Sequence, residues 1–158
     1  MWDPARFATD TTYARDFANL NVLTYLMRHA DSNPGNVLIS TDSTNPRLFA
    51  VDNGVAFSSP DSPRGTFWKD LMVDRLPEAT VRRLRALTRA QLERTLSVVA
   101  QYRTEPDGRL EPMAPTARRK PFLNVEYADG IAQFGLTDQE IDGVWARLVE
   151  LLGKVDSG

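Results

Sequence analysis

Two carboxylates and one amide in the first third of the chain have the types and the spacing of ligands for a hard metal ion. Asp31 and Asn36 stand before a short apolar run, and Asp52 closes a second apolar run. Carboxylate and amide oxygens suit Mg²⁺, which prefers oxygen ligands and often binds phosphate oxygens at the same time. These residues therefore predict a site for a metal ion and a phosphate, provided that the fold brings them together.

The sequence between these residues predicts the element that would do so. Residues 37–39 and 48–51 are apolar, and the residues between them include Thr, Asp, Ser, Asn and Pro. Such a cluster is typical of a turn, so the segment predicts a β-hairpin. Because a hairpin places its two ends side by side, Asp31, Asn36 and Asp52 should converge there.

Helical patterns dominate the rest of the chain. Apolar residues recur at spacings of three and four across residues 11–28, which indicates a helix that leads into the Asp31 segment. Thr9 or Asp10 can cap its start, and residues 1–10 are expected to be an irregular lead-in. Further helices are expected at residues 66–73, 77–87, 89–103 and 137–152.

The other stretches carry weaker signals. Residues 58–65 and 104–120 are expected to be loops because of their Pro and Gly content. Residues 122–134 have helical spacing, but Gly130 weakens that pattern and leaves the assignment open. The whole pattern predicts an α+β fold, mostly α, with about five or six helices, one hairpin and no second sheet.

Length and composition fit a single domain that spans residues 1–158. The net charge of −2 gives no basic field, so neither nucleic acid nor an anionic membrane surface is an expected partner. The absence of cysteine excludes a disulfide scaffold and thiol catalysis. No apolar run reaches the ~18 residues of a membrane span, and the first residues lack a signal-peptide pattern. We therefore expect a cytoplasmic protein.

The spacing of His29, Asp31 and Asn36 resembles the H-R-D-x-x-x-x-N catalytic loop of protein kinases, with Ala in place of Arg. The sequence Asp-Asn-Gly at 52–54 resembles the metal-binding D-F-G of the same enzymes, with Asn in place of Phe. Over about residues 20–58, the chain is thus similar to the catalytic, C-terminal lobe of the kinase-like superfamily.

Two groups within this superfamily show the similarity. Residues 29–38 look like the corresponding loop of aminoglycoside phosphotransferases. Residues 25–27 and 52–54 are more similar to the Golgi secretory-pathway kinases, the phosphatidylinositol 3-/4-kinases and the HipA-type kinases, which is the group we favour. Ser32 and Asn33 stand where the lipid-kinase-like enzymes often carry Arg and His, so the substrate class stays open.

The resemblance implies a helical kinase C-lobe with one β-hairpin, and it implies ATP and Mg²⁺ as cofactors. Asp31 would be the catalytic base that orients the acceptor hydroxyl and takes its proton, while Asn36 and Asp52 would bind the metal ion and, through it, the nucleotide. His29, the one histidine of the chain, would be a packed residue that braces the catalytic loop. The alternative for Asp31, Asn36 and Asp52 is an ordinary structural role in turns.

A working kinase also needs a lobe that covers the nucleotide, with a Gly-rich loop and a strand Lys. Residues 1–28 contain neither Gly nor Lys, and no other segment carries a Gly-rich phosphate-binding motif. The chain could therefore be half of a split enzyme completed by a protein partner, a truncated or minimal kinase, or a catalytically inactive pseudokinase-type interaction module. A protein hydroxyl is the acceptor expected first, and a small-molecule or lipid hydroxyl is the second.

Overall fold

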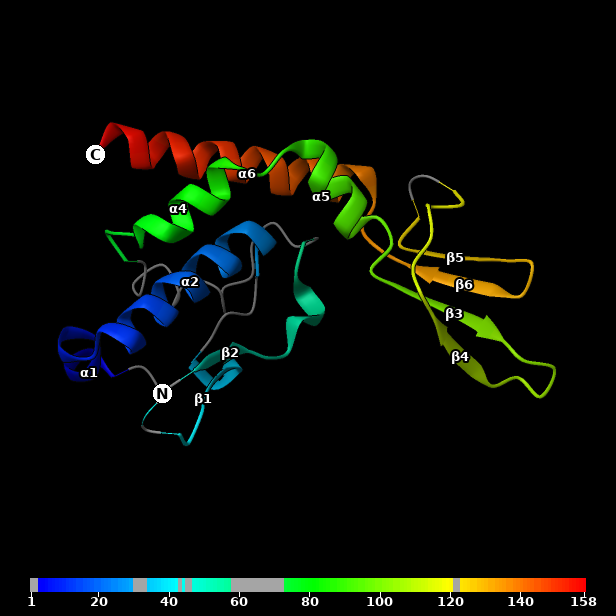
Figure 1. The fold of residues 1–158 in the computed structure, drawn as a ribbon, viewed down its shortest axis with the longest axis horizontal. Coiled ribbons are helices and arrows are strands. Elements are labelled where there is room, and N and C mark those ends of the chain that lie inside the picture. The colour runs from blue at the N-terminus through cyan, green and yellow to red at the C-terminus, as the bar shows by residue number, and fades with distance from the viewer. Residues whose placement is uncertain (1–2, 30–33, 43, 45–46, 58–72, 121–122) are drawn as a thin grey trace. The chain divides into compact units, whose positions relative to one another are not determined.

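The computed structural model divides the chain into two compact units, which are described separately (Figure 1). The first unit contains Met1–Arg85 and Leu151–Gly158, and the second contains Ala86–Glu150. The loop predicted over 58–65 lies outside the described residues, as does nearly all of the helix predicted over 66–73. The structure describes residues 3–29, 34–42, 44, 47–57, 73–120 and 123–158.

The start of the first unit is a short helix rather than the irregular lead-in that we predicted. Helix α1 spans Pro4–Thr9, and the carboxylate of Asp3 accepts a hydrogen bond from the main-chain N–H of Arg6 at 2.9 Å. Pro4 stands in the first turn, where its missing N–H leaves no bond unmade and its fixed φ suits a helix. The cap and the proline together favour the start of a helix at Pro4.

Helix α2 spans Thr11–Met27, as predicted. Asp10 caps it, because the main-chain N–H groups of Thr12 and Tyr13 each donate to its carboxylate at 3.0 Å. The bond from Tyr13 holds the pKa of the Asp10 carboxyl below its usual range, and the Arg6 side chain lowers it further. The cap is therefore strongest when this carboxyl is charged.

The predicted hairpin is present and packs on α2. Strand β1 (Val37–Ile39) pairs antiparallel with β2 (Leu48–Ala50), and Figure 1 shows the pair beside α2. Phe17 and Leu20 of α2 are buried and form the centre of this small core. The partly buried residues packed against them are Phe7, Val37, Leu48, Ala50 and Val73.

Helix α4 spans Glu78–Arg85, close to the predicted bounds. Its apolar residues Val81 and Leu84 are buried, and its arginines are exposed. Arg85 forms an ion pair with Asp156, which belongs to the same unit. The arginine-rich side of α4 is thus a solvated helix face.

The second unit begins with helix α5 (Arg89–Leu96), which starts at a capping box. The main-chain N–H of Gln91 donates to Thr88 Oγ1 at 3.2 Å, and the main-chain N–H of Thr88 donates to Gln91 Oε1 at 2.7 Å. The prediction that this helix continues to Arg103 is wrong. The chain leaves the helix at Ser97 and enters a strand, because the residues that follow are rich in β-branched and aromatic side chains.

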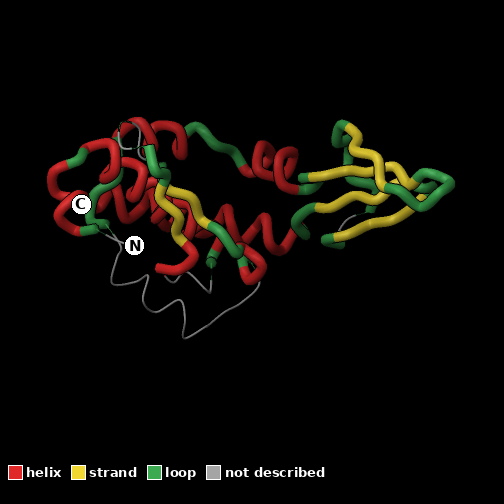
Figure 2. Tube along the Cα trace, turned by 90° about the horizontal axis from the view of Figure 1, so that it is seen from below, coloured by secondary structure: helices red, strands yellow, loops and turns green. Residues whose placement is uncertain are grey.

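A four-stranded antiparallel sheet follows, and it corrects the prediction of one hairpin and no second sheet (Figure 2). The strand order is β4-β3-β6-β5, so β3 and β6 are the inner strands. The described residues thus form an α+β fold with two antiparallel sheets. The strands are β3 (Ala100–Thr104), β4 (Leu110–Met113), β5 (Val125–Ala128) and β6 (Ile131–Phe134).

Two local features explain why these strands resemble loops or a weak helix in the sequence. Pro112 lies within β4, an edge strand, where a residue without an N–H group is tolerated. Asp129 and Gly130 join β5 to β6 with φ values of 53° and 70°. An Asp-Gly pair with both φ values positive is the typical two-residue hairpin turn, and it was the available signal for these strands.

One face of this sheet is buried and polar. Gln101 on β3 lies opposite Gln133 on β6, and Gln133 Nε2 donates to Gln101 Oε1 at 2.9 Å. The same Nε2 lies 3.1 Å from the carbonyl oxygen of Ala117, and Gln133 Oε1 accepts from the main-chain N–H of Arg119 at 3.0 Å. The main-chain N–H of Thr116 donates to Gln101 Oε1 at 3.1 Å. The two glutamines therefore hold the segment after β4 over the sheet.

Gly135 lies where the main chain after β6 passes close to the end of α5. A Cβ atom at this position would lie 1.9 Å from the carbonyl oxygen of Ser97, far inside any real contact distance. Next to it, the main-chain N–H of Leu136 donates to the carbonyl oxygen of Leu96 at 2.8 Å. This close approach of two main-chain segments requires glycine.

Helix α6 spans Asp138–Ser157 and begins at the predicted capping box. The main-chain N–H of Glu140 donates to Thr137 Oγ1 at 3.2 Å, and that of Thr137 donates to Glu140 Oε2 at 2.7 Å. Ile141 and Leu148 are buried, in agreement with the predicted core face. Among the residues that the structure describes, no helix is long and apolar enough to cross a membrane.

Candidate functional site

The β1–β2 hairpin brings two of the three predicted site residues to the same end. Asn36 immediately precedes β1, and Asp52 follows β2. The main-chain N–H of Val51 donates to the carbonyl oxygen of Asn36 at 2.9 Å, so the hairpin ladder continues up to these residues. Asp31, the predicted base, lies outside the described residues.

Asp52 has an unusual main-chain conformation. Its φ and ψ are both 56°, in the left-handed region that few residues other than glycine adopt, although Asp and Asn adopt it more readily than most. Asp52 is exposed to solvent. Its side chain makes no capping hydrogen bond to the 3₁₀ turn that follows, η2 (Asn53–Val55). The conformation thus turns the chain sharply at the end of the hairpin and leaves the carboxylate at the surface.

His29, which precedes the hairpin in the chain, contacts the main chain of this turn. Its side chain is buried, and its Nε2 lies 3.0 Å from the carbonyl oxygen of Asp52. Because a carbonyl oxygen only accepts, Nε2 must carry the hydrogen of this bond. The main-chain N–H of His29 donates in turn to the carbonyl oxygen of Thr24 at 3.1 Å. The prediction that His29 is a packed residue is confirmed, and the group that it holds is the main chain of Asp52.

A second main-chain bond ties the segment after the hairpin to the end of α2. The N–H of Phe57 donates to the carbonyl oxygen of Met27 at 2.7 Å.

Three residues of this region have positive φ values: Arg28, Asp52 and Phe57, at 48°, 56° and 70°. In the described part of the chain only one other non-glycine residue, in the β5–β6 turn, has a positive φ. Concentration of such costly conformations in one place is a feature of functional sites as well as of tight turns.

The oxygen donors of this site can take part in the binding of a hard cation. Asp52 offers a surface carboxylate, and Asn36, which is partly buried, offers an amide oxygen. No group of three or more His, Cys, Asp or Glu side chains suited to a metal ion occurs among the described residues. A carboxylate and an amide oxygen are donors of the type that Mg²⁺ accepts, and this ion commonly takes only one or two carboxylates from the protein and completes its shell with water and substrate phosphates.

An apolar surface lies on the outer face of the same hairpin. Leu38 and Phe49 are cross-strand neighbours, and they are 53% and 49% exposed. Leu23 of α2 is 46% exposed. A hollow of about 370 Å³ is lined by Leu23, Phe49, Asp16, Asn19, Leu20, Leu48 and Ala50. The site thus has a polar end at Asp52 and an apolar surface along β1 and β2.

Two features of this unit were missed by sequence reasoning. The bond from His29 to the main chain of Asp52 joins residues 23 positions apart, and only the expectation of a bracing histidine pointed toward it. A larger cavity, lined by α2, α4 and the end of α6, has no local sequence signal, because its walls come from distant segments.

The chain was also compared with known proteins, and no protein-family model, no curated protein and no solved structure gave a match. What the site can do therefore follows from its own residues and their geometry.

Proposed function

We propose that the chain is the catalytic lobe of a kinase-like phosphotransferase, which transfers the γ-phosphate of ATP to a hydroxyl group with the help of Mg²⁺. The observation that carries this proposal is the bond from buried His29 to the carbonyl oxygen of Asp52, at the end of the hairpin where Asn36 also lies. This bond holds the main chain at the residue whose carboxylate would bind the metal ion.

Each residue has one role in this proposal. Asp52 and Asn36 supply oxygen ligands to Mg²⁺, and the metal ion neutralises charge on the nucleotide phosphates when it is bound. Asp31 orients the acceptor hydroxyl and receives its proton. His29 is a positioning residue, which acts through the main chain of Asp52. A protein hydroxyl is the acceptor that we expect first, and a small-molecule or lipid hydroxyl is the second.

Isothermal titration of the full chain with Mg-ATP tests this proposal directly. We expect saturable binding that disappears when EDTA removes the metal ion, because the protein ligands contact the nucleotide through Mg²⁺. A Kd of about 1 mM or tighter would be measurable in this way. The absence of any Mg-dependent heat, from the chain alone and from the chain with a copurifying partner, would overturn the proposal.

A second candidate function is a pseudokinase-type interaction module, in which the same lobe recruits a protein partner without chemistry. The half-exposed apolar side chains of Leu23, Leu38 and Phe49 favour it, because exposed apolar groups that cluster on one surface often mark an interaction site. Sedimentation of the chain at several concentrations separates the candidates. Self-association without Mg-ATP binding supports the module, whereas a monomer that binds Mg-ATP supports the phosphotransferase.

A further inference from the structure

The two edges of the four-stranded sheet in the second unit differ in their chemistry (Figure 1). Strand β4 forms one edge and contains Pro112, which has no N–H group to offer another strand. Strand β5 forms the other edge and contains neither proline nor lysine, the residues that commonly keep an edge strand from pairing with another chain. Among the described strands only β6 pairs with β5. The β5 edge is therefore the one that can accept a further strand.

The main-chain groups that face this edge follow from the pairing of β5 with β6. In an antiparallel pair, residues that lie opposite each other are alternately joined and not joined by main-chain hydrogen bonds. The N–H of Gly135 donates to the carbonyl oxygen of Asn124 at 2.8 Å, so these two residues form a bonded pair. Val125 and Tyr127, the next residue and the third one along, are then in unbonded pairs with β6. Their N–H and carbonyl groups point away from β6, toward the open edge.

Exposed apolar side chains accompany these main-chain groups. Val125 and Tyr127 are 53% and 61% exposed, and Leu123, just before the strand, is 49% exposed. Side chains two residues apart point to the same face of a strand, so these three form an apolar row along the edge. Pairing with another strand would satisfy the main-chain groups and cover the apolar row at the same time.

The single charged side chain of β5 is neutralised within its own unit. Glu126 points to the opposite face of the strand, where its side chain is 7% exposed and its Oε1 lies 3.0 Å from Lys120 Nζ. Like charges that lie opposite each other on two strands oppose their pairing. Because the ion pair with Lys120 offsets the charge of Glu126, two copies of β5 can lie side by side with little repulsion.

We propose that β5 pairs antiparallel with β5 of a second copy of this chain, about a two-fold axis at Glu126. The main-chain groups of Val125 then bond to those of Tyr127 of the second copy, and the same bonds form in the other direction. The edge is thus complementary to itself, as an interface between two copies related by a two-fold axis must be.

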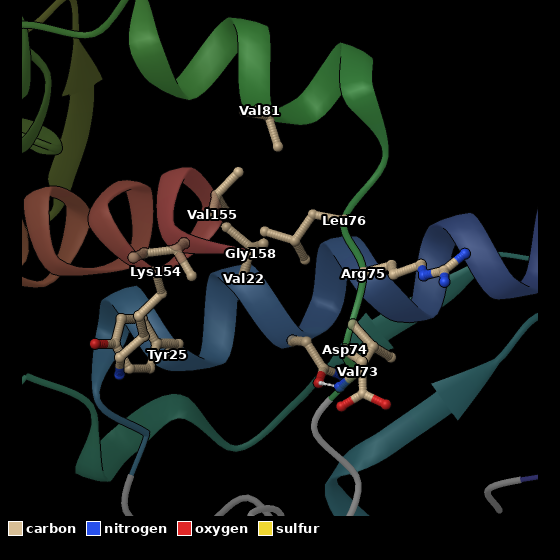
Figure 3. Close-up of a pocket in the computed structure, with 12 residues that line it drawn as sticks. Val22, Tyr25, Val73, Asp74, Arg75, Leu76, Val81, Lys154, Val155 and Gly158 are labelled. Carbon is tan, nitrogen blue, oxygen red and sulfur yellow. Dashed lines mark hydrogen bonds between the residues drawn. The ribbon is translucent and has the colours of Figure 1, made fainter.

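This interface is independent of phosphoryl transfer. The Asp52 site and the cavity shown in Figure 3 belong to the first unit, whereas β5 belongs to the second. A dimer that formed through β5 would therefore leave the predicted metal ligands in place in each copy.

Analytical ultracentrifugation of the full chain at several concentrations tests the proposal. We expect a reversible equilibrium between monomer and dimer. Val125→Lys places a charge in the apolar row and should raise the dissociation constant of the dimer by at least about tenfold. Leu110→Lys is the matched control, because Leu110 is 50% exposed but lies on β4, at the other edge of the sheet. This variant should dimerise like the wild type.

Two more variants test the main-chain bonds and the location of the interface. Tyr127→Pro removes the N–H that points to the open edge but no bond to β6, a position at which an edge strand tolerates proline. It should also raise the dissociation constant by at least about tenfold. If Tyr127→Pro fails to fold, the Val125→Lys variant at an exposed side chain still decides the question. Phe49→Lys, on the hairpin of the first unit, should dimerise like the wild type.

Amide hydrogen exchange identifies the groups that pair. The N–H groups of Val125 and Tyr127 should exchange more slowly in the dimer than in the monomer, because pairing with the second copy would bury them. The proposal would be overturned by a chain that stays monomeric up to about 1 mM, or by an unchanged dissociation constant in Val125→Lys. Loss of the dimer in Leu110→Lys or in Phe49→Lys, or equal exchange of both amides in monomer and dimer, would also overturn it.

Discussion

The imidazole Nε2 of His29 lies 3.0 Å from the carbonyl oxygen of Asp52, and this bond joins the segment that follows α2 to the residue that follows β2. The bond contacts the main chain of Asp52 and leaves its carboxylate at the surface. His29 therefore holds the main chain from which the carboxylate extends. The positioning role of His29 and the metal-binding role of Asp52 can therefore be tested separately, with a variant at each residue.

The first prediction concerns His29. Replacement by Ala removes the donor to Asp52 and leaves a gap in a buried position, so we expect a loss of about 1–3 kcal/mol in the free energy of unfolding. His29→Gln keeps a side-chain N–H and should lose less. Urea denaturation measures both variants. Equal stability of the wild type and His29→Ala would show that the bond contributes nothing to the folded state.

The second prediction separates the roles of Asp52 and Asp31. Asp52→Asn removes a charged metal ligand but tolerates the same left-handed conformation, so Mg-ATP should no longer raise the Tm. Asp31→Asn should retain the Mg-ATP shift in Tm while turnover falls by roughly 10²–10⁴. Thermal melts with and without Mg-ATP provide the measurement. The same ligand-induced shift in all three proteins would remove Asp52 from the site.

The third prediction is a pH dependence at the start of α2. The bond from the Tyr13 N–H lowers the pKa of the Asp10 carboxyl below its ordinary value, so the charged carboxylate stabilises the folded chain. This contribution is fully present above the unfolded pKa and is lost as the pH falls through the lower, folded pKa. Asp10→Asn should therefore have a lower Tm than the wild type at pH 7, and the difference should shrink below about pH 4. A difference in Tm that stays constant down to pH 2 would contradict this account.

The fourth prediction compares two glycines. Gly135→Ala places a methyl group 1.9 Å from the carbonyl oxygen of Ser97, so main-chain atoms must move and we expect a loss of about 1–3 kcal/mol or more. Gly153→Ala is the control, because it lies in α6 with no neighbouring atom within 4 Å of the added Cβ. There Ala should stabilise the helix by about 0.5–1 kcal/mol. Chemical denaturation that gave the same sign for both variants would rule out the close contact at Gly135.

Helices α2, α4 and α6 were predictable because their signals are local. Asp10 stands beside the helix that it caps, and Thr137 and Glu140 form their capping box within one turn. The hairpin was predictable for the same reason, since a polar turn separates two apolar runs. Asn36 and Asp52 could thus be placed at one end of the hairpin from the sequence, although their role in metal binding stays a prediction.

The four-stranded sheet was not predicted because Pro112 and Gly130 hid its two hairpins, and the pairing of β3 with β6 that joins them is not local. Gln101 and Gln133 are polar, yet both are buried, and Gln133 donates a hydrogen bond to Gln101 across the two strands. Pro112 favours a loop in the sequence, because proline is tolerated in a strand mainly at the edge of a sheet. Only the structure shows that β4 is an edge strand. The conformation of Asp52 likewise depends on a contact with His29 that no local pattern contains.

The pairing of β3 with β6 also has a consequence for the order of folding events. The pairs β3–β4 and β5–β6 each join strands that are adjacent in the chain, whereas β3–β6 joins the two hairpins across a long loop. Closure of that loop costs chain entropy before the contacts between β3 and β6 can compensate for it. We therefore expect the two hairpins to form first and to pair with each other late in folding. The bond between Gln133 and Gln101 spans this late junction. Loss of either amide should therefore accelerate unfolding far more than it slows refolding.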